Sequence, residues 1–323
     1  MRFIFEGNIM VHVAMIGTGK VGGEVAFSLV FERYVTKLSL VDIAPGVAEM
    51  TKEEFSHAVA SHALTVEIEA YDNGALLRDA DLIVISAGFP RTPDMSRRAL
   101  ADRNAQVVKD VIEKTLDNNP NAWYFVITNP ADAMATLANK VAQGKRTIIG
   151  TGTNLETVRF KTILSRELNV PLSMLEAYTG GEHGEDAVLL WSTVKINGMP
   201  LEEYLGKTGK TINKNKCENY VKEVSSQVIK SLGGTRFGPA GSFIEVLRGI
   251  LLNTGKVMSY GRIRKFDTVP EPVYITVPAI ASRSLGPDIW DFLTEKEHKA
   301  IESAADAVYK AYGEAKKAAG LIL

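Results

Sequence analysis

The sequence predicts an α/β protein whose first half forms a doubly wound parallel sheet and whose second half forms an α+β domain. Short apolar runs alternate with longer helical segments between residues 11 and 150. The runs 82–85 and 123–127 are apolar throughout, as in parallel strands that are buried on both faces. A chain of 323 residues is longer than a single hydrophobic core usually supports. We therefore expect two domains, residues 10–150 and 151–323, with the boundary near Gly150.

Each expected element follows from its apolar pattern. In the first half, strands are expected at 11–16, 38–41, 65–70, 82–85, 123–127 and 147–149. A helix is expected from the glycine turn after the first strand to about residue 33, and further helices over about 47–63 and 99–117. This alternation is typical of a Rossmann sheet. In the second half we expect helices over 154–168, 216–232 and 240–253, and antiparallel strands over 257–264 and 273–277. A capping box, Thr294 with Glu297, opens the last helix.

The composition limits the kind of partner that the chain can have. The formal net charge is -1, and 23% of the residues are charged, so we expect neither nucleic acid nor an anionic membrane as a partner. No apolar run approaches the ~20 residues that a bilayer requires. The single cysteine, Cys217, excludes an internal disulfide and a cysteine-rich zinc site, and it favours the reducing cytoplasm. No spacing of His, Cys and carboxylates suggests a metal.

A glycine-rich turn follows the first expected strand. Gly17, Gly19 and Gly22 fit the pattern G-x-G-x-x-G, which lets a backbone turn approach a pyrophosphate at a helix N-terminus. Asp42 ends the second strand, where a carboxylate binds the adenosine ribose. No Lys or Arg occurs between Asp42 and Lys52, so the sequence favours NAD over NADP. A methyltransferase has a similar turn and is the rival interpretation.

Several polar residues fall where a doubly wound sheet binds ligands. Arg91 and Arg97 follow the fourth strand and Asn129 follows the fifth, so all three are expected at the carboxyl edge of the sheet. Arg159 lies on the helix that opens the second half, and His183 stands next to Gly184 in a Gly-Glu-His-Gly sequence. Arginines hold carboxylates, and a histidine exchanges protons near neutral pH.

Together these motifs resemble the lactate/malate dehydrogenase family, and more closely its malate dehydrogenases of the lactate-dehydrogenase-like branch. The resemblance runs from about Val11 to the C-terminal helix. It is carried by Gly17-x-Gly19-x-x-Gly22, Asp42, Ser86-Ala87-Gly88, Arg91, Arg97, Asn129-Pro130-Ala131-Asp132, Leu155-Glu156-x-x-Arg159, Gly181-Glu182-His183-Gly184, and Gly234-Thr235 before Phe237-Gly238-Pro239.

The resemblance implies an enzyme that moves a hydride between NAD and malate or oxaloacetate, a reaction of the tricarboxylic acid cycle. His183 is then the general base and acid, Glu156 orients it, and Arg97 polarises the substrate carbonyl. Arg159 binds the C1 carboxylate, and Arg91 pairs with the second carboxylate, for which lactate enzymes typically have Gln. The family is usually a homodimer or homotetramer.

The resemblance also implies the binding residues. Substrate binding is expected from Arg91, Arg97, Asn129, Arg159 and Thr235. Cofactor binding is expected from Gly17, Gly19, Lys20, Val21, Gly22, Asp42, Ala87, Gly88, Asn104 and Asn129.

Three residues depart from the family pattern. Glu156 stands where the family nearly always has Asp, Glu185 replaces an Asp, and Asp94 replaces a loop glycine. On the sequence alone, we expect the change Glu156→Asp to retain or raise activity. Two alternatives stay open: a lactate or other 2-hydroxy acid dehydrogenase, and a dinucleotide-binding scaffold without catalytic activity.

Overall fold

The computed structural model describes residues 4–5, 8–9, 11–89 and 97–321. The chain divides into two compact units. The first comprises Met1–Thr151, Pro239–Ile244 and Tyr309–Leu323, and the second comprises Gly152–Gly238 and Glu245–Val308. No helix within the described residues has the length and apolar character needed to cross a membrane.

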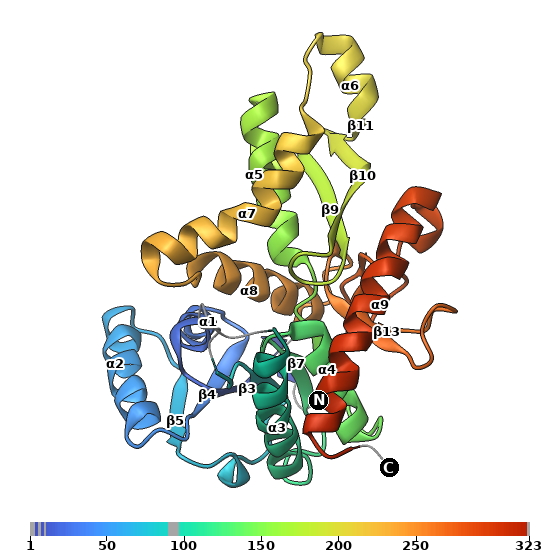
Figure 1. Ribbon diagram of the computed structural model, residues 1–323. Coiled ribbons are helices and arrows are strands. Elements are labelled where there is room, and N and C mark those ends of the chain that lie inside the picture. Colours follow the sequence, from blue (N-terminus) through green and yellow to red (C-terminus); the bar gives the residue numbers. More distant parts are fainter. Residues whose placement is uncertain (1–3, 6–7, 10, 90–96, 322–323) are drawn as a thin grey trace. The chain divides into compact units, whose positions relative to one another are not determined.

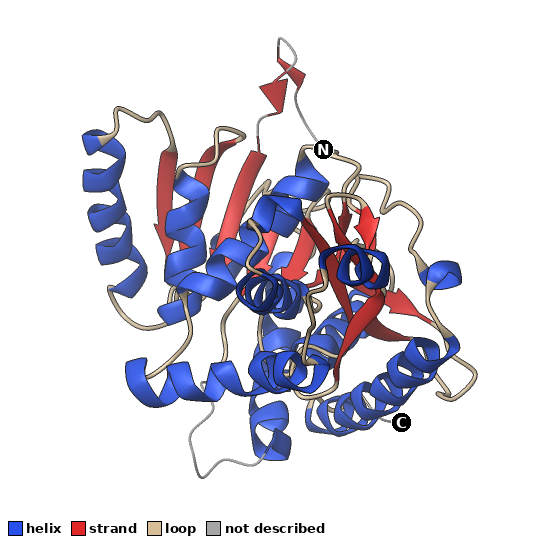
Figure 2. Ribbon diagram, turned by 90° about the horizontal axis from the view of Figure 1, so that it is seen from above, coloured by secondary structure: helices blue, strands red, loops and turns tan. Residues whose placement is uncertain are grey.

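The first unit is built on a parallel sheet with the strand order β5-β4-β3-β6-β7-β8. This is the strand order of a Rossmann fold, so the predicted fold class is confirmed. Figures 1 and 2 show its strands with helices packed against them. The strands are β3 (Val11–Ile16), β4 (Val35–Val41), β5 (Glu67–Tyr71), β6 (Leu82–Ile85), β7 (Trp123–Val126) and β8 (Ile148–Gly150), and the helices are α1 (Lys20–Val30), α2 (Val47–Ser61), α3 (Arg97–Thr115) and α4 (Ala131–Ala142).

The strands of this sheet are apolar in the middle of the sheet and lead into polar residues and glycines at their carboxyl ends. The middle strands are buried on both faces, which explains their continuous apolar sequences. Strand β4 begins at Val35, three residues before its expected start. The apolar pattern missed these residues because they include Lys37, which pairs with Glu67 and Glu69 on the neighbouring β5. At the opposite ends of the strands, Gly17, Asp42 and Ser86 follow β3, β4 and β6 directly, so they share one edge.

The second unit contains an antiparallel sheet with the order β11-β10-β9-β14-β13. Its elements are α5 (Asn154–Leu168), β9 (Leu175–Gly181), β10 (Ala187–Ile196), β11 (Met199–Pro200), α6 (Leu201–Thr208), α7 (Lys214–Leu232), β12 (Val257–Met258), β13 (Gly261–Arg264), β14 (Val273–Thr276) and β15 (Ala279–Ile280). Helices α8 (Phe237–Leu251) and α9 (Glu295–Ala318) each contribute residues to both units. The core of the second unit includes Phe160, Leu164 and the buried thiol of Cys217.

The prediction of a single strand over residues 257–264 is wrong. The structure divides it into β12 and β13, with Ser259 and Tyr260 between them. Strand β12 pairs with β15, whereas β13 pairs with β14, so the chain changes partners at this point. Both intervening side chains are fully buried, which is why the apolar pattern runs through the break.

Helix α9 begins with the expected capping box. The Glu297 carboxylate accepts a hydrogen bond from the Thr294 backbone N–H at 2.9 Å, and Thr294 Oγ1 accepts one from the Glu297 N–H at 3.3 Å. Glu297 also accepts hydrogen bonds from the Ser192 N–H at 3.1 Å and the Ser192 hydroxyl at 2.7 Å. Ser192 lies where the pairing of β10 with β9 is interrupted. Glu297 therefore satisfies a backbone donor that the sheet leaves without a strand partner.

We expect Glu297→Ala to lower the free energy of unfolding by about 2 kcal/mol, because a helix cap and a buried donor lose their acceptor together. Burial raises the pKa of the Glu297 carboxyl, but the hydrogen bonds from Thr294 and Ser192 outweigh it and hold the pKa below its ordinary value. The stabilisation is therefore complete above the ordinary carboxyl pKa and declines as the pH falls through the folded value.

Denaturant unfolding at pH 7 and at pH 3 measures this effect. The control is Glu295→Ala, which removes an exposed carboxylate paired with Lys299 on the same helix and is expected to change stability by less than about 0.5 kcal/mol. Equal losses for the two variants, or a loss for Glu297→Ala that grows on acidification, would contradict this role.

Candidate active site

The glycine turn after β3 gives each glycine a different task. Gly17 has φ +90°, and a Cβ there would lie 2.6 Å from the backbone of Ala87. A Cβ at Gly22 would lie 2.0 Å from the Gly17 carbonyl oxygen, so α1 and β3 pack too closely for any side chain. At Gly19, the N-cap of α1, a Cβ would meet nothing within 4 Å. The turn thus leaves open space at the helix N-terminus, where a pyrophosphate binds.

Asp42 is held in place beside this turn. Its Oδ2 accepts hydrogen bonds from the Thr18 N–H at 2.9 Å and the Thr18 hydroxyl at 3.0 Å, and its Oδ1 accepts one from the Ala44 N–H at 3.0 Å. The carboxylate is therefore oriented by the first strand-helix turn and by its own chain. The open cradle at Gly19 and this fixed acceptor fit the phosphates and ribose of a dinucleotide.

Asn104 supports the neighbouring part of this edge from inside the unit. Its side chain is 1% exposed. Its Oδ1 accepts a hydrogen bond from the Phe89 N–H at 2.7 Å, and its Nδ2 donates one to the Asn129 carbonyl at 2.7 Å. Asn104 thereby links the chain that follows β6 to the chain that follows β7. Asn129 itself is exposed.

In the second unit, helix α5 carries two of the candidate residues. Gly152 has φ +58°, and a Cβ there would lie 2.4 Å from the Gly261 nitrogen, so only glycine allows the chain to enter the helix at this point. Thr153 is the N-cap, which places Glu156 in the first turn, where the helix dipole favours a negative charge. Arg159 follows one turn later on the same side of the helix.

His183 stands two residues beyond the end of β9. Gly181 has φ +83°, and a Cβ there would lie 2.5 Å from the Asp186 carbonyl oxygen. Gly184 has φ +133° and open space around it. The two glycines therefore let the chain turn sharply on both sides of the histidine and present its ring to α5.

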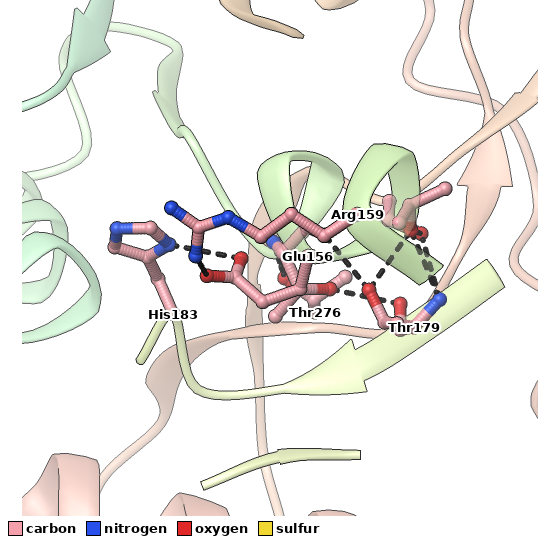
Figure 3. A network of polar contacts seen from close by, with 8 residues as sticks. Glu156, Arg159, Thr179, His183 and Thr276 are labelled. Carbon is pink, nitrogen blue, oxygen red and sulfur yellow. Dashed lines mark hydrogen bonds and ion pairs between the residues drawn. The ribbon is translucent and has the colours of Figure 1, made fainter. Parts of the chain in front are cut away.

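The Glu156 carboxylate contacts both His183 and Arg159 (Figure 3). Glu156 Oε2 lies 3.0 Å from His183 Nδ1, and Glu156 Oε1 lies 3.4 Å from Arg159 Nη1. The Glu156 side chain is 2% exposed, whereas the side chains of Arg159 and His183 are 14% and 16% exposed. The cluster thus has a buried anion with two cation-forming groups that remain partly accessible.

The electrostatics of the cluster are set by burial and pairing. Burial raises the pKa of the Glu156 carboxyl, but the charge and hydrogen bond of His183, together with Arg159, outweigh it, so the pKa lies below its ordinary value. Burial also lowers the pKa of Arg159, against the opposing effect of Glu156. Glu156 is therefore an anion, and the ring nitrogen that faces it carries a proton.

The other expected site residues are placed as follows. Arg91 and Asp94 lie outside the described residues, and Arg97 opens α3. Thr235 lies half-buried between α7 and α8, and Glu185 is exposed after the histidine turn. Within the described part of the chain, no group of His, Cys, Asp and Glu side chains could hold a metal ion.

Sequence reasoning missed a set of buried hydroxyls behind the cluster. Thr153, the N-cap of α5, and Thr157 on α5 bond to Thr179 on β9, and Ser259 and Thr276 join them from other segments. The spacing of Thr153 and Thr157 on either side of Glu156 was the available signal. It could not reveal their partners, which lie 22 to 123 residues away in the chain.

A dinucleotide cradle in one unit, together with a carboxylate-oriented histidine and an arginine in the other, defines the class of NAD-dependent dehydrogenases that act on small acids. Two family models match the chain: lactate/malate dehydrogenase, NAD binding domain, over residues 11–150, and lactate/malate dehydrogenase, alpha/beta C-terminal domain, over residues 153–318. The chain belongs to the lactate/malate dehydrogenase family. It is an NAD-dependent oxidoreductase.

Individual relatives agree with this family. The malate dehydrogenase of Sulfurisphaera tokodaii is 36% identical over 305 residues, which cover 94% of this chain and 96% of that protein. The L-lactate dehydrogenase of Thermus aquaticus is 29% identical over 300 residues, which cover 91% and 96%. The crystal structure of Cryptosporidium parvum malate dehydrogenase matches the fold with a TM-score of 0.87 at 24% identity, covering 96% of this chain and 100% of that one.

We expect Asp42→Ser to weaken NADH binding about tenfold, because the ribose hydroxyls lose a charged acceptor. NADPH should bind less weakly to the variant than to the wild type, since the repulsion of its 2′-phosphate is removed. Fluorescence titration with both cofactors measures this. Thr18→Val is the control, because it removes one hydrogen bond to Asp42 and leaves the carboxylate. If NADH affinity were unchanged in Asp42→Ser, the carboxylate would serve only the turn.

Proposed function

We propose that this protein catalyses the reversible oxidation of malate to oxaloacetate with NAD. The observation that carries the proposal is the Glu156 carboxylate between His183 Nδ1 and Arg159 Nη1, at 3.0 and 3.4 Å. A positioned proton acceptor beside a carboxylate-binding guanidinium is what the oxidation of a 2-hydroxy acid requires.

His183 moves the proton of the reaction. Its Nδ1 hydrogen bond to Glu156 fixes the tautomer, so Nε2 exchanges the proton with the substrate hydroxyl. Oxidation needs the neutral imidazole as a base, and reduction needs the imidazolium as an acid. The adjacent carboxylate stabilises the charged form, as in a catalytic triad. NAD, when bound, supplies the hydride acceptor or donor.

Arginines and neighbouring residues would hold the substrate. Arg159 binds the C1 carboxylate in two-pronged fashion, and its partial exposure leaves the guanidinium accessible. By the family pattern, Arg97 polarises the carbonyl, and Asn129 and Thr235 complete the binding set. Arg91 pairs with the second carboxylate. Facing the methyl group of pyruvate, the same guanidinium would be desolvated without a partner, at a cost of roughly several kcal/mol.

The cofactor would be held by the turn from Gly17 to Gly22, which includes Lys20 and Val21, and by Asp42. Ala87, Gly88 and Asn129 lie along the same edge of the sheet and would complete the site. We assign Asn104 to supporting this edge through Phe89 and Asn129, because its buried amide is already used at both ends.

We also propose that the protein works in the cytoplasm, in the tricarboxylic acid cycle, as a homodimer or homotetramer. The lone buried cysteine is compatible with a reducing compartment. Large exposed apolar side chains support self-association, among them Phe27 on α1, Phe31 at the C-cap of α1 and Met50 on α2. Sedimentation equilibrium is expected to give a mass of two or four chains. A monomer at micromolar concentration would refute this part.

Steady-state oxidation of NADH with oxaloacetate and with pyruvate tests the activity. We expect oxaloacetate to be the preferred substrate. Arg91→Gln should reduce kcat/KM for oxaloacetate about 100-fold, because a charge-assisted pair with the second carboxylate is lost, and should reduce turnover of pyruvate far less. Arg98→Gln, which removes a charge seven positions further along the chain, is the control and should leave the preference unchanged.

Three results would count against the proposal. A strong preference for pyruvate in the wild type would make the protein a lactate dehydrogenase. NADH binding without turnover of either acid would make it a scaffold. Equal losses with both acids in Arg91→Gln would give Arg91 a structural role.

A further inference from the structure

Helix α5 and strand β9 are joined by a closed set of hydroxyl side chains. The Thr153 hydroxyl donates to the Thr179 carbonyl at 2.8 Å, and the Thr179 hydroxyl donates to the Thr153 carbonyl at 2.7 Å. Each residue thus satisfies the backbone of the other. Thr276 Oγ1 accepts a hydrogen bond from the Thr153 N–H at 3.1 Å and extends the contact to β14. We call Thr153, Thr157, Thr179, Ser259 and Thr276 the hydroxyl clamp.

Thr157 is the centre of the hydroxyl clamp. Its Oγ1 lies 2.8 Å from Thr179 Oγ1 and 2.9 Å from Ser259 Oγ, and it accepts a hydrogen bond from the Thr179 N–H at 3.0 Å. All five members of the clamp are at most 2% exposed. Buried polar groups that lose a partner are costly, so the bonds resist any change in the distance between α5 and β9.

The clamp lies beside the acid-base pair on both elements. Thr157 follows Glu156 directly on α5. Thr179 lies near the end of β9, four residues before His183, and Figure 3 shows both with Glu156. Fixing Thr157 against Thr179 therefore fixes the gap that the Glu156 side chain must span to reach the imidazole. At the observed spacing this side chain reaches His183 Nδ1 at 3.0 Å.

We propose that the hydroxyl clamp is a set of positioning residues that holds α5 and β9 at the spacing matched to a glutamate at position 156. The inference rests on the proposed acid-base role of His183. An aspartate would withdraw the carboxylate by one carbon-carbon bond, about 1.5 Å, which exceeds the tolerance of a hydrogen bond. The clamp prevents the backbone from closing that distance. On this proposal Glu156→Asp lowers activity, whereas the sequence alone led us to expect that activity is retained or raised.

Two readouts test the clamp in the full-length protein. The first is an NMR titration of the His183 ring, identified by its absence in His183→Asn, which needs no substrate. The second is the pH dependence of kcat/KM for oxaloacetate. The variants are Thr157→Val, which keeps the side-chain shape, and the milder Ser259→Ala. Thr162→Val is the matched control, because its hydroxyl donates to the Val158 carbonyl of its own helix.

We expect Thr157→Val to shift the midpoint of the His183 titration downward by about one pH unit, because the imidazolium loses contact with its carboxylate. Ser259→Ala should shift it in the same direction by less. The falling limb of the rate profile for oxaloacetate reduction should move to lower pH in parallel. Thr162→Val should move neither. Glu156→Asp should reproduce the shift and lower kcat/KM at least about tenfold.

A double-mutant cycle shows whether the clamp acts through Glu156. In a Glu156→Gln background, Thr157→Val should cause no further shift of the titration midpoint. The inference is overturned if Ser259→Ala and every folded Thr157 variant keep the wild-type midpoint, or if Glu156→Asp does. A wild-type protein that turns over neither acid would refute the proposed function, whereas the NMR titration would still decide the role of the clamp.

Discussion

The second unit depends on keeping one buried carboxylate charged. A carboxylate at 2% exposure is unstable as an anion unless other groups replace the water that it has lost. For Glu156, the lost water is replaced by His183 and Arg159, and the helix dipole in the first turn of α5 adds to the stabilisation of the negative charge. The glycines at 152 and 181 and the hydroxyl clamp all serve the same end, because they bring these groups within reach of one side chain.

The cofactor cradle of the first unit and the Glu156 cluster of the second unit achieve their precision by different chemistry. Around the glycine turn, the decisive contacts involve backbone atoms, and a Cβ in the wrong place would remove the space that a ligand needs. Around Glu156, the decisive contacts join side chains, and the length of a single side chain sets the geometry. The cofactor cradle is therefore sensitive to added atoms, and the Glu156 cluster is sensitive to removed ones.

Much of the fold could be predicted because it follows from local pattern. The strands at 11–16 and 82–85 coincide with their apolar runs, and the capping box of α9 follows from two residues. Strands β9 and β10 had no such signal: β9 ends in two glycines, and the pairing of β10 is broken midway. The partner of Glu156 was suggested by resemblance to the family. The hydroxyl clamp could not be predicted, because its contacts are set by tertiary packing. The roles of Arg91, Arg97 and Thr235 remain predictions.

The thiol in the core of the second unit has a consequence for regulation. Burial raises the pKa of Cys217, the single cysteine of the chain, to about 11. At neutral pH only about one such group in ten thousand is a thiolate, the form that reacts with peroxides and disulfides. The Cys217 thiol is therefore a poor target for a change in cellular redox poise. A change in the NADH/NAD ratio should therefore act on the enzyme as a change in substrate concentration, without oxidation of this cysteine.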